Sequence, residues 1–444
     1  MGSARQNNLT AFVEIQEASH LKSQYDAIVV GAGSAGVAAA ICAARAGLST
    51  LLVERNSSPG GGVEGACVHS LCGLYLSSPD AIARPANGGF ALEFAERLLK
   101  SGSAIGPVRM ERMDILLQEP ALFSLFCSNL IAREKNLTTV FDAHLEAAEG
   151  TDSHLEAVKI SSHGEPIRAS VFIDTSGDGL VALLSGAAFE MDSPSDSHGP
   201  AYFFRIGDVA ANVDDHEGRR DFSRKIVEGI RKGFLNPQLA AAVLCPTPGA
   251  TQARAIIDLA DEGDHFSPLN PEWVTQLQIL GCNLATELES YLRENVEGFK
   301  KCTVSVCPIK STVSRSRRIL GRYQLTARDI LEAAEFPDTV SLSSWPLEVR
   351  GFPKIKHPPH DKPSGIPLRC LISRDFENLL MAGRCMSSTH GAQGALRVVG
   401  TSLAMGQAAG LAAVAVVRST TKSIPCGMEP EIARPILEEV LKGA

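Results

Sequence analysis

The first clear pattern of apolar positions lies between Tyr25 and Arg55. A short apolar run from Ala27 to Val30 is followed by a glycine-rich turn and an alanine-rich stretch that reaches Ala46. A second apolar run covers residues 49–53. Two short apolar runs on either side of a helical stretch predict a strand–helix–strand unit with parallel strands.

The turn in this unit has the spacing G-x-G-x-x-G, made by Gly31, Gly33 and Gly36. The first glycine permits a tight turn, the second lets the backbone approach a pyrophosphate, and the third lets the helix pack close to the strand. Phosphates would lie on the free N–H groups at the start of the helix, and Glu54 would accept hydrogen bonds from ribose hydroxyls. The pattern predicts a dinucleotide site; the alternative is a glycine turn that holds no ligand.

Patterns further along the chain predict a second unit and a buried helix. Residues 201–210 alternate in the manner of a strand, and residues 271–295 are helical in pattern. A proline-rich loop over residues 352–371 then leads back. The apolar stretch 398–417 approaches the length of a membrane span, but Thr401, Gln407 and three glycines favour a buried helix.

Length, charge and cysteine content narrow the class of protein. A chain of 444 residues exceeds one ordinary core, so we expect two closely joined domains. The net charge of -8 gives no footprint for nucleic acid or an anionic membrane. Eleven cysteines without a CxxC pair favour reduced thiols and a cytoplasmic location. Residues 1–24 lack the apolar core of a signal peptide and are interpreted as a flexible leader.

Three motifs in order carry a family resemblance. Gly60, Gly61 and Gly62 follow Glu54 closely, and such a run lets backbone lie against a flat ring or a phosphate, which NAD dehydrogenases do not need. Residues 169–187 contain D-T-S-G-D-G, and residues 377–413 join A-G-R to a helix of small residues. On these motifs the chain resembles the FAD-dependent oxidoreductase family of glutathione-reductase-type flavoproteins, near the fumarate reductase and succinate dehydrogenase flavoproteins.

The resemblance implies an α/β fold in which a discontinuous, Rossmann-like FAD-binding domain is formed by residues 25–190 and 366–420. An α+β substrate domain would be inserted at residues 191–365, and residues 421–444 would form a C-terminal tail with a helix. The cofactor would be FAD, with the isoalloxazine at the start of the last small-residue helix. The implied FAD contacts are Gly31, Gly33, Ser34, Ala35, Gly36, Glu54, Arg55, Gly61, Gly62, Asp174, Gly177, Asp178, Gly383, Arg384, Val399 and Gly400.

The chain has no second G-x-G-x-x-G turn and no CxxC redox pair. We therefore favour hydride transfer between flavin N5 and a small metabolite, which a carboxylate group would suit, with oxygen, a quinone or a partner protein as electron acceptor. The kind of bond oxidised or reduced stays open. The alternative is a protein in which FAD is a structural or signalling element rather than a catalyst.

The resemblance also places residues 61–75 along the isoalloxazine. This segment offers Cys67, His69, Cys72 and Tyr75. His69 has three open roles: an acid or base, a covalent tether for the flavin, or a structural histidine. Cys72 is the second candidate for a tether.

Arg397 is the one charged residue in a stretch of glycine, alanine and other small residues. A buried guanidinium needs an anionic or carbonyl partner. One hypothesis is that Arg397 grips a carboxylate of the substrate, assisted by His390. The other is an ion pair with Glu64 or Asp178 that locks the loop.

Two further polar groups are weaker candidates. Four arginines lie close together at positions 315, 317, 318 and 322, and we interpret most of them as a solvated helix face or interdomain ion pairs, with Arg318 as the one that reaches the flavin. His357 and His360 are candidates to cap the site from the proline-rich loop. Pro358 and Pro359 between them prevent the helical turn that would align two metal ligands, so we predict no metal site.

Overall fold

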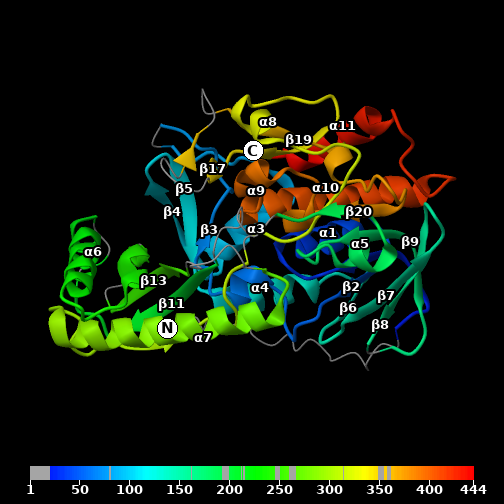
Figure 1. Ribbon diagram of the computed structural model, residues 1–444. Helices are drawn as coiled ribbons and strands as arrows, with labels where there is room; N and C mark the ends of the chain where they lie inside the picture. Colours follow the sequence, from blue (N-terminus) through cyan, green and yellow to red (C-terminus); the bar gives the residue numbers. More distant parts are fainter. Residues whose placement is uncertain are drawn as a thin grey trace, which may run out of the picture.

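The computed structural model describes residues 21–444 except 80–81, 162, 193–199, 212, 214–215, 246–250, 260–266, 314, 349–354 and 358–361. Residues 1–20 of the predicted leader and His360 therefore lie outside the described residues. The described chain has a mixed α/β architecture with a large sheet in one half and a smaller sheet in the other (Figure 1).

The large sheet has the strand order β6-β2-β1-β9-β8-β7, with β20 paired to β9. Strands β1, β2, β6, β9 and β20 are parallel, whereas β7 and β8 join in antiparallel fashion. The bounds are β1 Gln24–Val30, β2 Thr50–Val53, β6 Leu137–Val140, β7 Leu145–Gly150, β8 Leu155–Ile160, β9 Ile167–Asp174 and β20 Leu379–Met381. The predicted strand–helix–strand unit is confirmed, with α1 at Ser34–Arg45 between β1 and β2.

The carboxyl ends of four parallel strands meet at one edge of this sheet. Val30 is opposite Val53 on one side and Asp174 on the other, and Met381 is opposite Asp174. In open parallel sheets, ligands bind beyond the carboxyl ends of the strands. The register therefore brings the three sequence motifs to a single edge.

Helix α10, Val399–Arg418, packs along α1 (Figure 1). Glycine makes this close approach possible: a Cβ on Gly406 would lie 2.2 Å from the carbonyl oxygen of Ala35, and one on Gly410 would lie 2.5 Å from that of Ala39. Helix α10 is long and apolar enough to cross a membrane, yet 78% of its apolar window is buried inside the protein. The prediction of a buried helix is confirmed.

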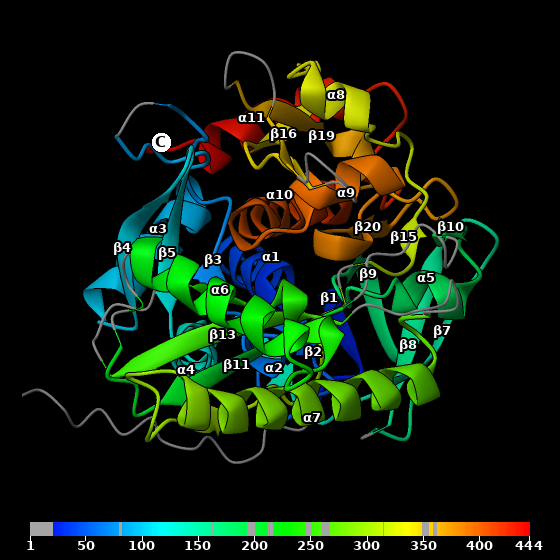
Figure 2. The ribbon, with the colours of Figure 1, turned by 60° about the vertical axis from the view of Figure 1, so that its left-hand side comes forward.

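The smaller sheet has the order β12-β13-β11-β14 and carries helices α6 and α7 (Figure 2). Alternate residues of β11, namely Tyr202, Phe204 and Ile206, are buried in a core of their own, as the alternation predicts. Asn270 caps α7 by accepting from the Glu272 N–H at 2.8 Å. The bounds are β11 Ala201–Gly207, α6 His216–Arg231, β12 Val243–Cys245, β13 Gln252–Asp258, α7 Pro271–Asn295 and β14 Thr303–Val306.

Shorter elements complete the described chain. The helices are α2 Gly62–Gly65, α3 Gly89–Lys100, α4 Pro120–Ile131, α5 Leu180–Ser185, α8 Ala327–Leu331, α9 His390–Leu396 and α11 Glu429–Val440, with 3-10 turns at Pro237–Ala241, Leu368–Cys370 and Gly383–Cys385. The strands are β3 Ser70–Leu71, β4 Ala104–Met110, β5 Met113–Gln118, β10 Phe189–Glu190, β15 Arg318–Ile319, β16 Thr339–Ser343, β17 Leu347–Glu348, β18 Ile355–Lys356 and β19 Ser364–Pro367.

The hydrophobic cores bear on where one unit ends and the next begins. Leu325, Val340 and Leu347 belong to the same core as helices α1 and α10, and so do Ala433 and Val440 of the C-terminal tail. The core of the smaller sheet runs only from residue 202 to residue 302. The sequence division at residues 190 and 365 stays a prediction, and the cores favour a shorter insert than residues 191–365.

Candidate cofactor and substrate site

The turn between β1 and α1 has the geometry that phosphate binding requires. Gly31 has φ +101°, and a Cβ on Gly36 would lie 1.7 Å from the Gly31 carbonyl oxygen, so neither position tolerates a side chain. A Cβ on Gly33, by contrast, would meet nothing within 4 Å. No side chain caps the start of α1, so its first N–H groups and its dipole are available to an anion.

Glu54 closes the other end of this turn. Its side chain is buried and accepts hydrogen bonds from the Ala32 N–H at 2.6 Å, from the Asn56 N–H at 2.9 Å and from Asn56 Nδ2 at 2.6 Å. The carboxylate is thereby held at the tip of β2, where a ribose would lie. Gly61, with φ +54°, rests against the turn, because its Cβ would come within 2.9 Å of the Gly33 Cα.

The two acidic residues of the second motif have different tasks. Asp174 is fully buried and accepts from Ser176 Oγ at 2.6 Å and from the Val181 N–H at 2.8 Å, so it organises the start of α5. Asp178 lies 2.7 Å from Arg384 and 3.5 Å from Arg55. Burial opposes ionisation of Asp178, but the two arginines outweigh it and lower its pKa.

The third motif brings Arg384 and the start of α10 to the same edge. Gly383 has φ +80°, and Arg384 follows it with its guanidinium 3.0 Å from where a Cβ of Gly177 would be. The Gly400 N–H donates to the Cys72 carbonyl at 2.9 Å. This contact fixes the segment around Cys72 against the first turn of α10, next to Val399. The resemblance-based cofactor residues are thus gathered on one side of the large sheet.

Arg397 ends helix α9 and is paired with Glu348. The predicted partners, Glu64 and Asp178, are wrong, because Glu348 of strand β17 reaches Arg397 instead. The side chain is 27% exposed, so the guanidinium is partly open rather than fully enclosed, although its Nε is buried and makes no hydrogen bond in the described structure. Burial and Glu348 raise the pKa of the adjacent Cys72 thiol to about 12.

His390, at the start of α9, lies between an acid and an arginine. Its Nδ1 is 2.9 Å from Asp192 Oδ2, and Arg315 Nη1 is 2.5 Å from its Nε2. The same guanidinium nitrogen also lies 2.9 Å from Nδ1, so the imidazole ring is held between Arg315 and Asp192. Burial, with Arg397 and Arg318 nearby, lowers the pKa of Arg315 to about 10 even though Asp192 and Glu348 act in the other direction.

Arg318 is more enclosed than a residue that contacts substrate would need to be. It is 2% exposed and donates to Asp192 Oδ1 at 2.6 Å and to the Ser388 carbonyl at 2.9 Å. Residues 318–319 form strand β15, so Arg318 does not lie on a helix, and its contact with the flavin stays a prediction. Arg315 lies within electrostatic reach of Arg397.

His69 is 3% exposed, and its ring packs edge-on against Phe203 of the smaller sheet at 5.6 Å. Burial and the nearby Arg254 charge lower the pKa of His69 to about 3. Its Nε2 is buried and forms no hydrogen bond among the described residues. The geometry is that of a neutral histidine between the two sheets. Burial also raises the pKa of Cys67, to about 11, so neither Cys67 nor Cys72 is a thiolate at neutral pH.

Several residues around the candidate site have no recognisable signal in the sequence. Asp192 and Glu348 carry no motif, and Lys310 lies in an unremarkable stretch. Arg315 was visible only as one member of an arginine cluster. Of the two loop histidines, His357 lies 3.2 Å from Ser77 Oγ. Within the described ranges, no three His, Cys, Asp or Glu side chains are grouped to hold a metal ion.

The fold and the glycine turn define an α/β nucleotide-binding protein, and the open space above Gly33 together with the fixed Glu54 carboxylate fits a dinucleotide. The model of the FAD dependent oxidoreductase family matches residues 26–426, and the chain belongs to this family. It is therefore an FAD-dependent oxidoreductase, and FAD is its cofactor.

Structural matches include a geranylgeranyl bacteriochlorophyll reductase-like protein from Thermoplasma acidophilum, with a TM-score of 0.46, 14% identity and coverage of 94% of this chain and 84% of that one. The flavin-dependent brominase Bmp2 has a TM-score of 0.48 and 12% identity, with coverage of 92% and 83%. The p-nitrophenol 4-monooxygenase PnpA from Pseudomonas putida has a TM-score of 0.45 and 11% identity, with coverage of 94% and 87%. At these values the matches add nothing to the assignment. No curated protein matches this chain.

Proposed function

We propose that this enzyme transfers a hydride between flavin N5 and a small metabolite that carries a carboxylate or carbonyl group. The proposal places the enzyme with glutathione-reductase-type flavoproteins near the fumarate reductases, in the cytoplasm, with oxygen, a quinone or a protein as electron acceptor. Bound FAD supplies the hydride chemistry. The protein's own contribution is to hold and orient the substrate.

The observation that carries this proposal is the Arg397 guanidinium at the α9–α10 junction, which is 27% exposed and whose buried Nε makes no hydrogen bond in the described structure. Arg315 lies within electrostatic reach of Arg397 and Arg318, and the described carboxylates that face these arginines are Glu190, Asp192 and Glu348. Arg318 and Asp192 form an enclosed pair, so Glu348 is the partner of Arg397. A substrate carboxylate would accept from the remaining donors of Arg397, and arginine can grip it through two parallel hydrogen bonds.

His390 has a supporting role in this arrangement. The ring is paired with Asp192 through Nδ1 and contacts Arg315 Nη1 through both ring nitrogens. We assign His390 to positioning Arg315 rather than to direct contact with the reacting carbon. Arg397, which is more exposed than Arg315, is assigned to the substrate itself.

The test is Arg397→Lys, assayed with the best substrate from a redox-dye screen of small hydroxy, amino and saturated carboxylic acids. Lysine keeps the charge and the reach to Glu348 but loses the two-pronged fork. We expect kcat/KM to fall by a factor that corresponds to a loss of about 2 to 4 kcal/mol of transition-state stabilisation. FAD content and melting temperature should stay unchanged.

The control is Arg328→Lys, which alters an exposed pair with Glu332. It should leave every quantity unchanged. If Arg397→Lys lowers FAD content or melting temperature but leaves turnover per bound FAD intact, Arg397 only locks the loop and the proposed role is lost. Absence of turnover with every acid would favour FAD as a structural or signalling element.

A further inference from the structure

Lys310 lies beside the glycine-rich segment at residues 60–65, although it belongs to none of the three motifs. It sits in the segment between β14 and β15, and its backbone N–H donates to the Gly65 carbonyl at 3.0 Å. Its side chain runs along α2, because a Cβ on Gly65 would lie 2.9 Å from the lysine Cε. The absence of a side chain at Gly65 is what lets the lysine lie there.

The positive charges around Lys310 favour binding of an anion. Burial, followed by the positive charges of Arg55 and Arg384, lowers the pKa of Lys310, while Asp178 and Glu54 act in the opposite direction. Asp178 is already shared by both arginines. No ion pair or hydrogen bond of the lysine Nζ occurs among the described residues. Three cations therefore meet around one shared carboxylate.

The two nearby glutamates do not neutralise Lys310. The Glu54 carboxylate is occupied by the backbone of Ala32 and by Asn56. Glu64 is within electrostatic reach of the lysine, but burial dominates and raises the pKa of Glu64, so this carboxylate is a weakened counter-charge.

The diphosphate of FAD is an anion that would balance these positive charges. It is expected on the free N–H groups at the start of α1. Helix α2, along which Lys310 lies, borders the same turn, since Gly61 touches Gly33. The lysine and the helix start thus flank one open space.

We propose that Lys310 binds the diphosphate of FAD from the side opposite helix α1. Lys310 would then connect the segment that leads out of the smaller sheet directly to the cofactor. The proposal depends on FAD binding alone and is independent of the substrate.

The experiment measures the rate at which FAD leaves the holoenzyme, followed by recovery of flavin fluorescence after dilution. Lys310→Met keeps most of the side-chain volume and removes the charge. We expect release to be about tenfold faster or more, the usual weight of a hydrogen bond to a charged group. Lys310→Arg should stay within about threefold of the wild type, because it restores the charge. The matched control is the exposed Lys301→Met, with no change expected.

Salt separates a charge effect from a packing effect. Release from the wild type should accelerate with potassium chloride, and Lys310→Met should lose part of that dependence. A Lys310→Met protein that is folded by circular dichroism but purified without flavin would also support the proposal. Wild-type release rates, equal acceleration in Lys310→Met and Lys310→Arg, an unchanged salt dependence, or an unfolded Lys310→Met protein would each overturn it.

Discussion

The nucleotide turn and the α9–α10 junction prepare for a negatively charged ligand in opposite ways. The turn relies on backbone: glycines open the space, and helix α1 offers uncapped N–H groups. The junction relies on side chains, with arginines held by carboxylates that come from residues as far apart as 192 and 348. Backbone sites tolerate little change of shape, whereas side-chain sites tolerate little change of charge.

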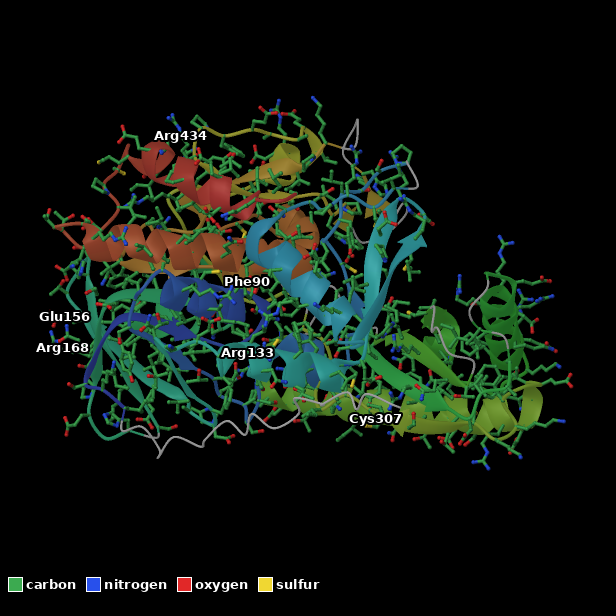
Figure 3. All side chains as sticks on the ribbon, turned by 180° about the vertical axis from the view of Figure 1, so that it is seen from behind. Phe90, Arg133, Glu156, Arg168, Cys307 and Arg434 are labelled. Atoms are coloured by element: carbon green, nitrogen blue, oxygen red, sulfur yellow. The ribbon has the colours of Figure 1, made fainter. Side chains whose placement is uncertain are left out.

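The largest expected effect tests the charged region. Asp192→Asn removes the partner of the buried Arg318 and of His390. An uncompensated buried guanidinium should cost about 3 to 5 kcal/mol of unfolding free energy, measured by urea denaturation. The control is Glu156→Gln, which breaks the exposed pair between Glu156 of β8 and Arg168 of β9 (Figure 3) and should cost less than about 1 kcal/mol. Equal losses would mean that the junction is no more enclosed than the surface.

The next effect tests the backbone region. Gly406→Val would place a side chain against the Ala35 backbone, which cannot move without shifting α1. We expect a loss of about 2 to 3 kcal/mol, seen in the same denaturation assay. The matched control is Gly164→Ala, at a glycine with open space around it, which should stay within about 0.5 kcal/mol of the wild type. A tolerated Gly406→Val would show that the two helices are not in close contact.

A smaller effect concerns His69, which lies between the two sheets. Its pKa is lowered to about 3 in the folded protein, against about 6.5 when unfolded. As pH falls below 6.5, the unfolded chain therefore gains a proton that the folded protein does not. Between pH 6 and pH 5, the wild type should lose about 1.2 kcal/mol more of its unfolding free energy than a His69→Asn variant loses. Parallel pH profiles for the two proteins would mean that His69 is exposed to solvent.

The smallest effect on stability accompanies a complete loss of cofactor. Gly33→Val adds a side chain where nothing lies within 4 Å, so the unfolding free energy of the protein without flavin should change by no more than about 0.5 kcal/mol. The added side chain occupies the place of the diphosphate, so the purified protein should be colourless. Flavin absorbance at the wild-type level would contradict the assignment of this turn.

The sequence predicts the backbone region better than the charged one. The turn depends on three glycines that lie within six residues of the chain, namely Gly31, Gly33 and Gly36. Their spacing alone therefore predicts the turn. The partner of Arg397 is instead Glu348, a residue 49 positions away that no local pattern marks. The fold determines which residues form such long-range ion pairs. The sequence indicates only that the Arg397 guanidinium needs an anionic or carbonyl partner. The roles considered for His69 stay predictions, and its burial against Phe203 depends on how the smaller sheet is placed.

The pairing of α1 with α10 also sets an order of events during synthesis. About 350 residues separate the two helices along the chain. At roughly 5 to 20 residues per second, on the order of 20 to 70 s pass between the emergence of α1 and that of its partner. Throughout this interval the alanine face of α1 lacks the surface that later covers it. The nascent chain is therefore expected to need a chaperone at α1, and FAD can be captured tightly only after α10 has left the ribosome.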